Sequence, residues 1–309
     1  MGEATREMVA TSSDCLRLFD LVGDEGGNSV SGGFVGRGRG NGVGTRLVPR
    51  AQLANTKADY SAPLTSFSWS TLEPTHIVTS SIDTTCTVWD IATSVPITQL
   101  IAHDREVYDV AWSPSSREVF ASVGADGSVR MFDLRSLEHS TILYEATPAP
   151  AQKNGAVVSP PATTPIPSPL LRLAFSPTSP TYVSVCHADS ADVQILDTRS
   201  PGTPAMEVRG HSGAINGMAW GGSTISGAGE TVGPGWLATC SDDCTLLLWD
   251  LSTTTPNPPP TTRSATAVPK LIQQPVLSWS SPSEINAVAW GGGGDWVAAG
   301  CGRLVRCLK

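Results

Sequence analysis

The chain has 309 residues, of which 30 are glycine and 24 are proline, and this content excludes a mainly helical protein because both residues disfavour helix interiors. Only 16% of the residues are charged and the net charge is −8, which argues against nucleic acid as the main ligand, since binding phosphates requires a basic surface. The sequence contains no apolar run of membrane-spanning length and no apolar segment typical of a secretory signal near Met1.

A short pattern recurs from the first residues to the last. It consists of a small or hydroxyl residue, an Asp in a predicted turn, and an alternating strand that ends in an aromatic or apolar residue followed by Asp. Copies occupy residues 13–20, 81–90, 124–133, 188–197 and 241–250, and residues 302–308 resemble a sixth copy without the final Asp. Alternation with period two predicts half-buried strands.

A second strand pattern precedes most of these copies and ends in Trp or Phe. It occupies residues 64–69, 107–112, 171–175, 215–220 and 285–290. Where no insert intervenes, the repeats are about 43 residues apart, as Asp90 and Asp133 are, and this period is typical of four-stranded blades. The two patterns together predict an all-β fold built of blades around a central axis.

These residues resemble the WD-repeat β-propeller family, in which a His, a Ser or Thr, an Asp and a Trp form a structural tetrad within a blade. One repeat fits all four positions, and two others fit in part. The candidate tetrad residues are His211, Thr239, Asp243 and Trp249; then His103, Ser122 and Asp126, where Phe132 replaces the Trp; and finally Thr79, Asp83 and Trp89, without the His. The resemblance implies buried polar groups that satisfy one another's hydrogen bonds.

Longer segments narrow the resemblance to one branch of that family. Residues 79–90, 100–109, 120–135 and 137–145 are similar to the plant Transparent Testa Glabra proteins and their animal counterpart, a cullin-associated WD-repeat factor that scaffolds DYRK kinases. The resemblance implies a nominally seven-bladed WD-repeat β-propeller. Since the repeats account for about five and a half blades, we expect residues 1–309 to form a single, N-terminally incomplete propeller domain.

Four segments of biased composition separate the predicted strands: 23–44, 146–169, 221–235 and 252–275. Their Gly-rich or Pro-rich sequences cannot bury enough apolar surface to fold, so we expect flexible inserts. The second insert contains four Ser/Thr-Pro pairs, which are candidate sites for a proline-directed kinase, although such pairs also arise from composition alone. The candidate phosphosites are Thr147, Ser159, Thr164 and Ser168.

The sequence predicts no catalytic residues and no metal site. The five histidines are scattered over different repeats, and no known nucleophile or zinc motif occurs. Cys240 and Cys244 have no second pair nearby, so we expect them to pack as small apolar residues. His103, Ser122 and Asp126 have the residue types of a hydrolase triad, but their repeat context favours a structural network. We therefore expect no enzymatic activity and no cofactor.

An Asp-x-Arg pattern follows two predicted strands in consecutive repeats. The residues are Asp133 and Arg135 in one repeat, and Asp197 and Arg199 in the next. The pattern resembles the one with which propellers of cullin-4 ligases dock on the ligase adaptor, although the usual preceding Trp is replaced in both repeats. The alternative is that each Arg is a solvated residue or pairs with the neighbouring blade.

Two functions follow from the resemblance. The first is a non-catalytic scaffold that assembles protein complexes, with a DYRK-type kinase and MYB or basic helix-loop-helix transcription factors as partners. The alternative is a substrate receptor of a cullin-4 RING ubiquitin ligase, with the cullin-4 ligase adaptor as partner. Neither function involves direct binding of nucleic acid, membrane or metal. The seven cysteines, odd in number and widely spaced, indicate reduced thiols and hence a cytoplasmic and nuclear protein.

Overall fold

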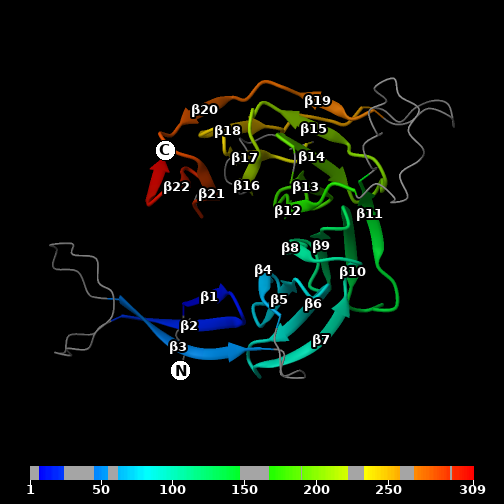
Figure 1. Cartoon of the computed structure of the whole chain (residues 1–309), viewed down its shortest axis with the longest axis vertical. Helices are drawn as coiled ribbons and strands as arrows, with labels where there is room; N and C mark the ends of the chain where they lie inside the picture. The colour runs from blue at the N-terminus through cyan, green and yellow to red at the C-terminus, as the bar shows by residue number, and fades with distance from the viewer. Residues whose placement is uncertain are drawn as a thin grey trace, which may run out of the picture.

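The computed structural model describes residues 7–23, 45–54, 62–146, 167–188, 190–221, 233–257, 268–292 and 294–309. Within these ranges the regular secondary structure consists of β-strands alone, and the strands form six separate sheets. Figure 1 shows the sheets arranged as blades around one axis, with one edge strand of each four- or five-stranded sheet towards the centre. The expected all-β propeller is therefore confirmed.

Each blade is a set of antiparallel strands that follow one another in the sequence. The first three blades are blade 1 (β1 Met8–Ser12, β2 Leu16–Gly23, β3 Thr45–Leu53), blade 2 (β4 Leu64–Trp69, β5 His76–Ser81, β6 Thr85–Asp90, β7 Val95–Ile101) and blade 3 (β8 Val107–Trp112, β9 Val119–Gly124, β10 Ser128–Asp133, β11 Thr141–Glu145). The others are blade 4 (β12 Leu170–Phe175, β13 Tyr182–His187, β14 Asp192–Asp197, β15 Met206–Arg209), blade 5 (β16 Ile215–Trp220, β17 Trp236–Ser241, β18 Thr245–Asp250, β20 Leu277–Ser280) and blade 6 (β21 Ile285–Trp290, β22 Val297–Cys301, β23 Leu304–Leu308).

The number of blades differs from the expected five and a half. The chain forms six blades, of which the first and the last have three strands in the described ranges. Three antiparallel strands with one apolar face against a neighbouring blade are sufficient to form a sheet, so the incomplete repeats at the two ends still become blades.

Both sequence patterns become strands at equivalent places in the blades. The pattern that ends in Trp or Phe forms the innermost strands β4, β8, β12, β16 and β21. The pattern that follows the turn Asp forms the third strands of blades 2 to 6 and the middle strand, β2, of blade 1. In blades 2, 3 and 5 the carboxylate of the turn Asp accepts a hydrogen bond from the backbone N–H of the residue two positions later. The residue between them has a positive φ, which is 74° at Thr84, 72° at Gly127 and 65° at Cys244.

The apolar core is divided among the spaces between consecutive blades. Between blades 2 and 3, for example, Val88 packs in the same buried cluster as Trp112 and Phe120. Indole N–H groups also cross between blades, since Trp220 donates to the carbonyl of Ala174 at 3.1 Å and Trp290 donates to the carbonyl of Ala219 at 2.8 Å. Each blade is thus held chiefly by its immediate neighbours.

The predicted inserts lie largely outside the described residues, which omit 24–44, 147–166, 222–232 and 258–267. The last predicted insert, 252–275, nevertheless contains an unexpected strand, β19 (Lys270–Ile272). This strand pairs in parallel with β15 and forms the fifth strand of blade 4. An outer edge presents unpaired backbone N–H and C=O groups, which explains why this short segment becomes ordered there. The described part of the chain contains no helix that could cross a membrane.

Candidate functional site

The complete candidate tetrad of blade 5 forms one continuous hydrogen-bonded chain. His211 Nδ1 lies 3.0 Å from Asp243 Oδ2, and His211 Nε2 lies 2.8 Å from Thr239 Oγ1. The indole N–H of Trp249 donates to the same hydroxyl oxygen at 2.9 Å. The structure therefore brings together all four residues that the sequence placed in this tetrad.

Burial and hydrogen bonds together set the protonation states of His211 and Asp243 in this network. Burial lowers the pKa of His211 below its ordinary value, although the Asp243 carboxylate opposes the change. Burial alone would raise the pKa of Asp243, but hydrogen bonds from Thr245 and Ser212 lower it to about 2. A neutral imidazole with its proton on Nδ1 donates to the ionised carboxylate and accepts from Thr239, so every polar group is satisfied.

Blades 2 and 3 contain partial versions of the same network. In blade 3 His103 Nδ1 lies 2.9 Å from Asp126 Oδ1, and His103 Nε2 lies 2.8 Å from Ser122 Oγ. Phe132 occupies the Trp position there and has no N–H to donate.

Blade 2 retains the other half of the network. Trp89 donates to Thr79 Oγ1 at 2.9 Å. Asp83 accepts instead from the hydroxyl of Thr85 at 2.6 Å, and no hydrogen bond in the described ranges joins Asp83 to Thr79. The His-containing half and the Trp-containing half therefore form independently of each other.

Sequence reasoning missed a fifth member of the network. Ser128 Oγ lies 3.1 Å from His103 Nδ1, and Thr245 Oγ1 lies 3.1 Å from His211 Nδ1. Both hydroxyls also donate to the turn Asp of their own blade. The signal was visible in the sequence, because a Ser or Thr stands two residues after the turn Asp at positions 85, 128 and 245.

These buried groups are poorly placed for chemistry. His103 is only 1% exposed and Ser122 is fully buried, so a substrate has no access to the triad-like group. Burial raises the pKa of the Cys240 thiol to about 12, which keeps it protonated and a poor metal ligand. Across the described ranges, no three His, Cys, Asp or Glu side chains are grouped to hold a metal ion.

The two Asp-x-Arg motifs have nearly identical geometry. Arg135 donates to both carboxylate oxygens of Asp133, at 2.9 Å from Nε and 2.6 Å from Nη2. Arg199 contacts Asp197 in the same way, at 2.9 Å and 2.7 Å. Because each Asp ends the third strand of its blade, the motifs lie at the same end of consecutive blades.

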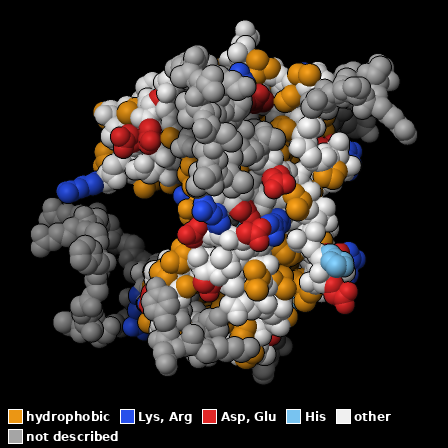
Figure 2. Space-filling view, turned by 45° about the vertical axis from the view of Figure 1, so that its right-hand side comes forward, with side chains coloured by type: hydrophobic (Ala, Val, Ile, Leu, Met, Phe, Trp, Pro, Cys, Tyr) orange, Lys and Arg blue, Asp and Glu red, His pale blue; other side chains and the backbone are white. Residues whose placement is uncertain are grey.

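Both guanidinium groups remain accessible despite these contacts. The side chain of Arg135 is 70% exposed and that of Arg199 is 63% exposed. Hydrogen bonds from Arg135 lower the pKa of Asp133 to about 2, so this pair is ionised at neutral pH. Figure 2 shows acidic and basic side chains next to each other on the visible surface. The two arginines thus form a pair of oriented, exposed hydrogen-bond donors.

The candidate phosphosites are only partly described. Thr147, Ser159 and Thr164 lie outside the described residues. Ser168 is described, and its hydroxyl oxygen is buried without a hydrogen-bond partner among the described residues. A kinase requires an exposed hydroxyl, so this conformation disfavours Ser168 as a phosphosite.

Known proteins are similar to this chain both in individual repeats and over most of its length. The family model described as "WD domain, G-beta repeat" matches residues 94–133 and 202–250, which include the two His–Asp networks. The chain is 37% identical to the DDB1- and CUL4-associated factor 7 homolog of Dictyostelium discoideum, over 98% of this chain and 75% of that protein.

Two yeast relatives match at similar levels of identity. A WD repeat-containing protein of Schizosaccharomyces pombe is 40% identical over 87% of this chain, and one of Saccharomyces cerevisiae is 45% identical over 62% of it. The chain spans 66% of the S. pombe protein and 35% of the S. cerevisiae protein. The repeats, the blades and the identity to the Dictyostelium relative together show that this chain belongs to the WD-repeat β-propeller family.

Proposed function

We propose that the protein is a non-catalytic scaffold that assembles protein complexes. The observation that carries this proposal is the burial of the protein's reactive side chains. The His–Ser–Asp and His–Thr–Asp groups form hydrogen bonds with one another inside the blades. The exposed groups with defined geometry are instead the charged pairs at the blade ends. A rigid set of blades with oriented charges at its rim is suited to holding other proteins.

The partners follow from the resemblance to the Transparent Testa Glabra branch. We propose a DYRK-type kinase and MYB or basic helix-loop-helix transcription factors as the proteins assembled, in the cytoplasm and the nucleus. The identity along most of this chain to a Dictyostelium protein named as a DDB1- and CUL4-associated factor supports a role in binding other proteins. Direct binding of nucleic acid, membrane or metal is not part of this function.

Kinase binding can be tested with purified components. The full-length protein, immobilised at low density, is expected to bind a purified DYRK-type kinase saturably, and the same protein after heat denaturation is expected not to. Absence of saturable binding by the native protein would refute the kinase proposal. An active-site assay of the kinase, with and without the propeller, would show whether binding positions substrates or alters the kinase itself.

A second candidate function is substrate reception for a cullin-4 RING ubiquitin ligase. The observation in its favour is the repeated Asp-x-Arg geometry, in which Asp133 and Asp197 hold Arg135 and Arg199 in matching, exposed orientations. The name of the Dictyostelium relative associates that protein with DDB1 and CUL4. In this candidate function the two guanidinium groups contact the ligase adaptor.

Charge reversal separates the two functions. Arg135→Glu combined with Arg199→Glu is expected to abolish adaptor binding and to leave kinase binding intact. Arg17→Glu is a matched control, because Arg17 pairs with Asp14 at 2.8 Å in blade 1, away from the two motifs. Adaptor binding that survives the double reversal, measured by surface plasmon resonance, would show that the motifs are not the docking site.

A further inference from the structure

The two Asp-x-Arg motifs differ in the side chain that lies beside each guanidinium group. The residue paired with Asp197 on the neighbouring strand is Tyr182, whereas the residue paired with Asp133 is Val119. The guanidinium carbon of Arg199 lies over the Tyr182 ring, 5.8 Å from its centre. The electron-rich face of an aromatic ring attracts a cation at this distance, and an aliphatic side chain does not. Blade 4 therefore supports its arginine in a way that blade 3 does not.

The aromatic ring beneath Arg199 is itself fixed in the core. Tyr182 is only 3% exposed and belongs to the buried cluster between blades 4 and 5, together with Trp220 and Leu237. Burial raises the pKa of the Tyr182 phenol, so the ring stays uncharged at neutral pH. A closely packed ring has few orientations available, and it restricts the guanidinium group that lies over it.

The carboxylates that hold the two arginines also differ. The side chain of Asp197 is 11% exposed, and that of Asp133 is 34% exposed. Water screens the ion pair of blade 4 less, because its carboxylate is more deeply buried. In blade 3 the pKa of Arg135 is raised chiefly by Asp133 and to a smaller extent by the charge of Glu118. A second carboxylate within electrostatic reach gives Arg135 an alternative partner, so its orientation is less restricted.

The contacts within blade 4 leave defined donors on Arg199 for another protein. Asp197 accepts from Nε at 2.9 Å and from Nη2 at 2.7 Å. A guanidinium group has five N–H donors, so the two N–H groups of Nη1 and one of Nη2 are not used by this carboxylate. The partner surface at this point accordingly presents carbonyl or carboxylate oxygens.

We propose that Arg199 is the anchor of the contact with the ligase adaptor, that Tyr182 is its positioning residue, and that Arg135 acts mainly on the approach of the adaptor. This inference rests on the second candidate function, in which both arginines contact the adaptor. An arginine that is already ordered loses less conformational freedom on binding, so its hydrogen bonds contribute more to affinity. A more mobile charge at the edge of a contact chiefly changes the association rate.

Alanine substitutions measure the inequality between the two arginines. In surface plasmon resonance with the purified adaptor, Arg199→Ala should weaken binding about thirtyfold, mainly through faster dissociation. Arg135→Ala should weaken it about threefold, mainly through slower association. Arg209→Ala is a matched control, because Arg209 pairs with Glu207 at 2.9 Å in the same blade but at the other end of β14. This variant should bind as the wild type does.

Substitutions beneath the guanidinium groups test the positioning role. Tyr182→Phe retains the ring and should bind the adaptor nearly as well as the wild type, whereas Tyr182→Leu should bind about fivefold more weakly. Because Tyr182 is buried, circular dichroism has to show that the leucine variant is folded. Val119→Tyr removes no core side chain and places a ring at the corresponding position of blade 3. It should strengthen binding about threefold through slower dissociation.

Nuclear magnetic resonance of the arginine Nε–H groups measures positioning without the adaptor. In the free protein the Arg199 signal should be shifted upfield by the ring and should exchange with water more slowly than the Arg135 signal. Each signal is assigned by its disappearance in the corresponding Arg→Lys variant. Tyr182→Phe should preserve the shift and the slow exchange, and Tyr182→Leu should abolish both. If Tyr182 served only the core, the Arg199 signal would not change in a folded Tyr182→Leu variant.

The outcomes separate this inference from the candidate function on which it rests. Equal losses of affinity from Arg135→Ala and Arg199→Ala would overturn the inference and leave the ligase function standing. An Arg199 signal that Tyr182→Leu does not change, or a Val119→Tyr variant that binds no more tightly, would also overturn it. If the wild type itself does not bind the adaptor, the candidate function is wrong and the inference with it. None of these results bears on the proposed scaffold function.

Discussion

Blades 5 and 6 begin alike and end differently. Their innermost strands share the pattern Ile-Asn-x-x-Ala-Trp, at 215–220 and 285–290. Blade 5 continues with the complete tetrad and a fourth strand, whereas blade 6 has three strands in the described ranges. The alternating pattern is therefore sufficient for strands to form, and the tetrad is not required for that step.

The difference lies in how the third strand is fixed. Trp249 is only 1% exposed and donates to Thr239, while Leu308 at the equivalent position is only half-buried and has no polar group to donate. Ala299 stands at the register of Thr239, so blade 6 also lacks the acceptor. The tetrad thus connects the third strand, the second strand and the turn of blade 5 into one unit, and blade 6 lacks this connection.

The largest expected effect comes from removing the indole of blade 5. Trp249→Ala should lower the free energy of unfolding by about 3–5 kcal/mol, because it leaves a large cavity and removes a buried hydrogen bond. Leu308→Ala should cost about 1–2 kcal/mol, since that side chain is only partly buried. Urea denaturation followed by far-ultraviolet circular dichroism measures both. Equal losses in the two variants would mean that the tetrad does not distinguish the blades.

A smaller effect is expected from the hydroxyl at the centre of the tetrad. Thr239→Val preserves the side-chain shape but leaves both Trp249 Nε1 and His211 Nε2 without a partner, at a cost of about 2–3 kcal/mol. Ser122→Ala in blade 3 should cost about 1–2 kcal/mol, because Phe132 offers no N–H there and one imidazole contact is lost. A loss from Ser122→Ala as large as that from Thr239→Val would contradict the contribution assigned to the indole.

The sequence predicted those features that depend on local spacing. The strand pattern located the innermost and third strands, and the tetrad of blade 5 could be assigned because each member stands at a fixed offset within one repeat. Ser128 and Thr245 stand at an equally fixed offset from the turn Asp, but the four-residue tetrad that the resemblance implies has no member at that offset, so the sequence did not assign them to the network. Their place in the network became evident only from the distances to the imidazoles.

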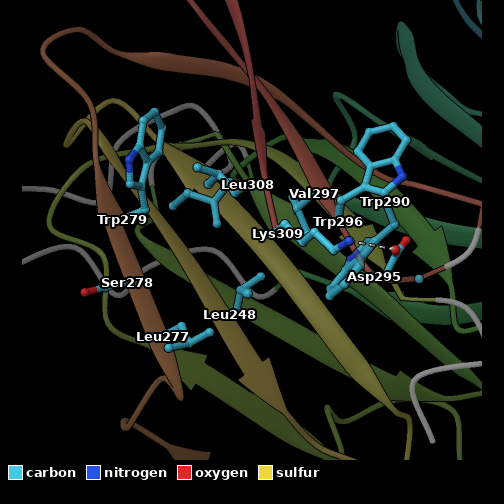
Figure 3. Close-up of a pocket in the computed structure, with 12 residues that line it drawn as sticks. Leu248, Leu277, Ser278, Trp279, Trp290, Asp295, Trp296, Val297, Leu308 and Lys309 are labelled. Carbon is cyan, nitrogen blue, oxygen red and sulfur yellow. Dashed lines mark ion pairs between the residues drawn. The ribbon is translucent and has the colours of Figure 1, made fainter.

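Features that depend on distant pairing could not be predicted. Nothing in residues 270–272 indicates that they pair with β15, because that contact depends on which outer edge lies within reach of the chain. The apolar cavity that Leu308 lines between blades 5 and 6 (Figure 3) was also hidden, since recognising it requires the register of β22 and β23 across a turn shorter than that of blade 5. The same holds for the matching orientation of Arg135 and Arg199.

The smallest expected effect is a dependence of stability on pH. It originates in His211 of blade 5, whereas residues 285–308 of blade 6 contain no histidine. The pKa of His211 in the folded protein is below its ordinary value of 6.5, so the unfolded chain takes up this proton more readily. The stabilising contribution is therefore fully present above that ordinary value and is lost as the pH falls towards the folded pKa. The loss is about 1.4 kcal/mol for each unit by which the two values differ.

The contribution of His211 has to be separated from carboxyl groups that act in the opposite direction. Burial raises the pKa of Asp109 and of Asp192, so protonation of these groups favours the folded state as the pH falls. Comparing wild type with His211→Gln at pH 7 and pH 5 removes their effect, since both proteins contain them. We expect the urea midpoint of the wild type to fall more steeply on acidification than that of the variant. Parallel decreases would show that His211 takes up its proton equally in the folded and unfolded chains, and the neutral imidazole assigned to blade 5 would then be wrong.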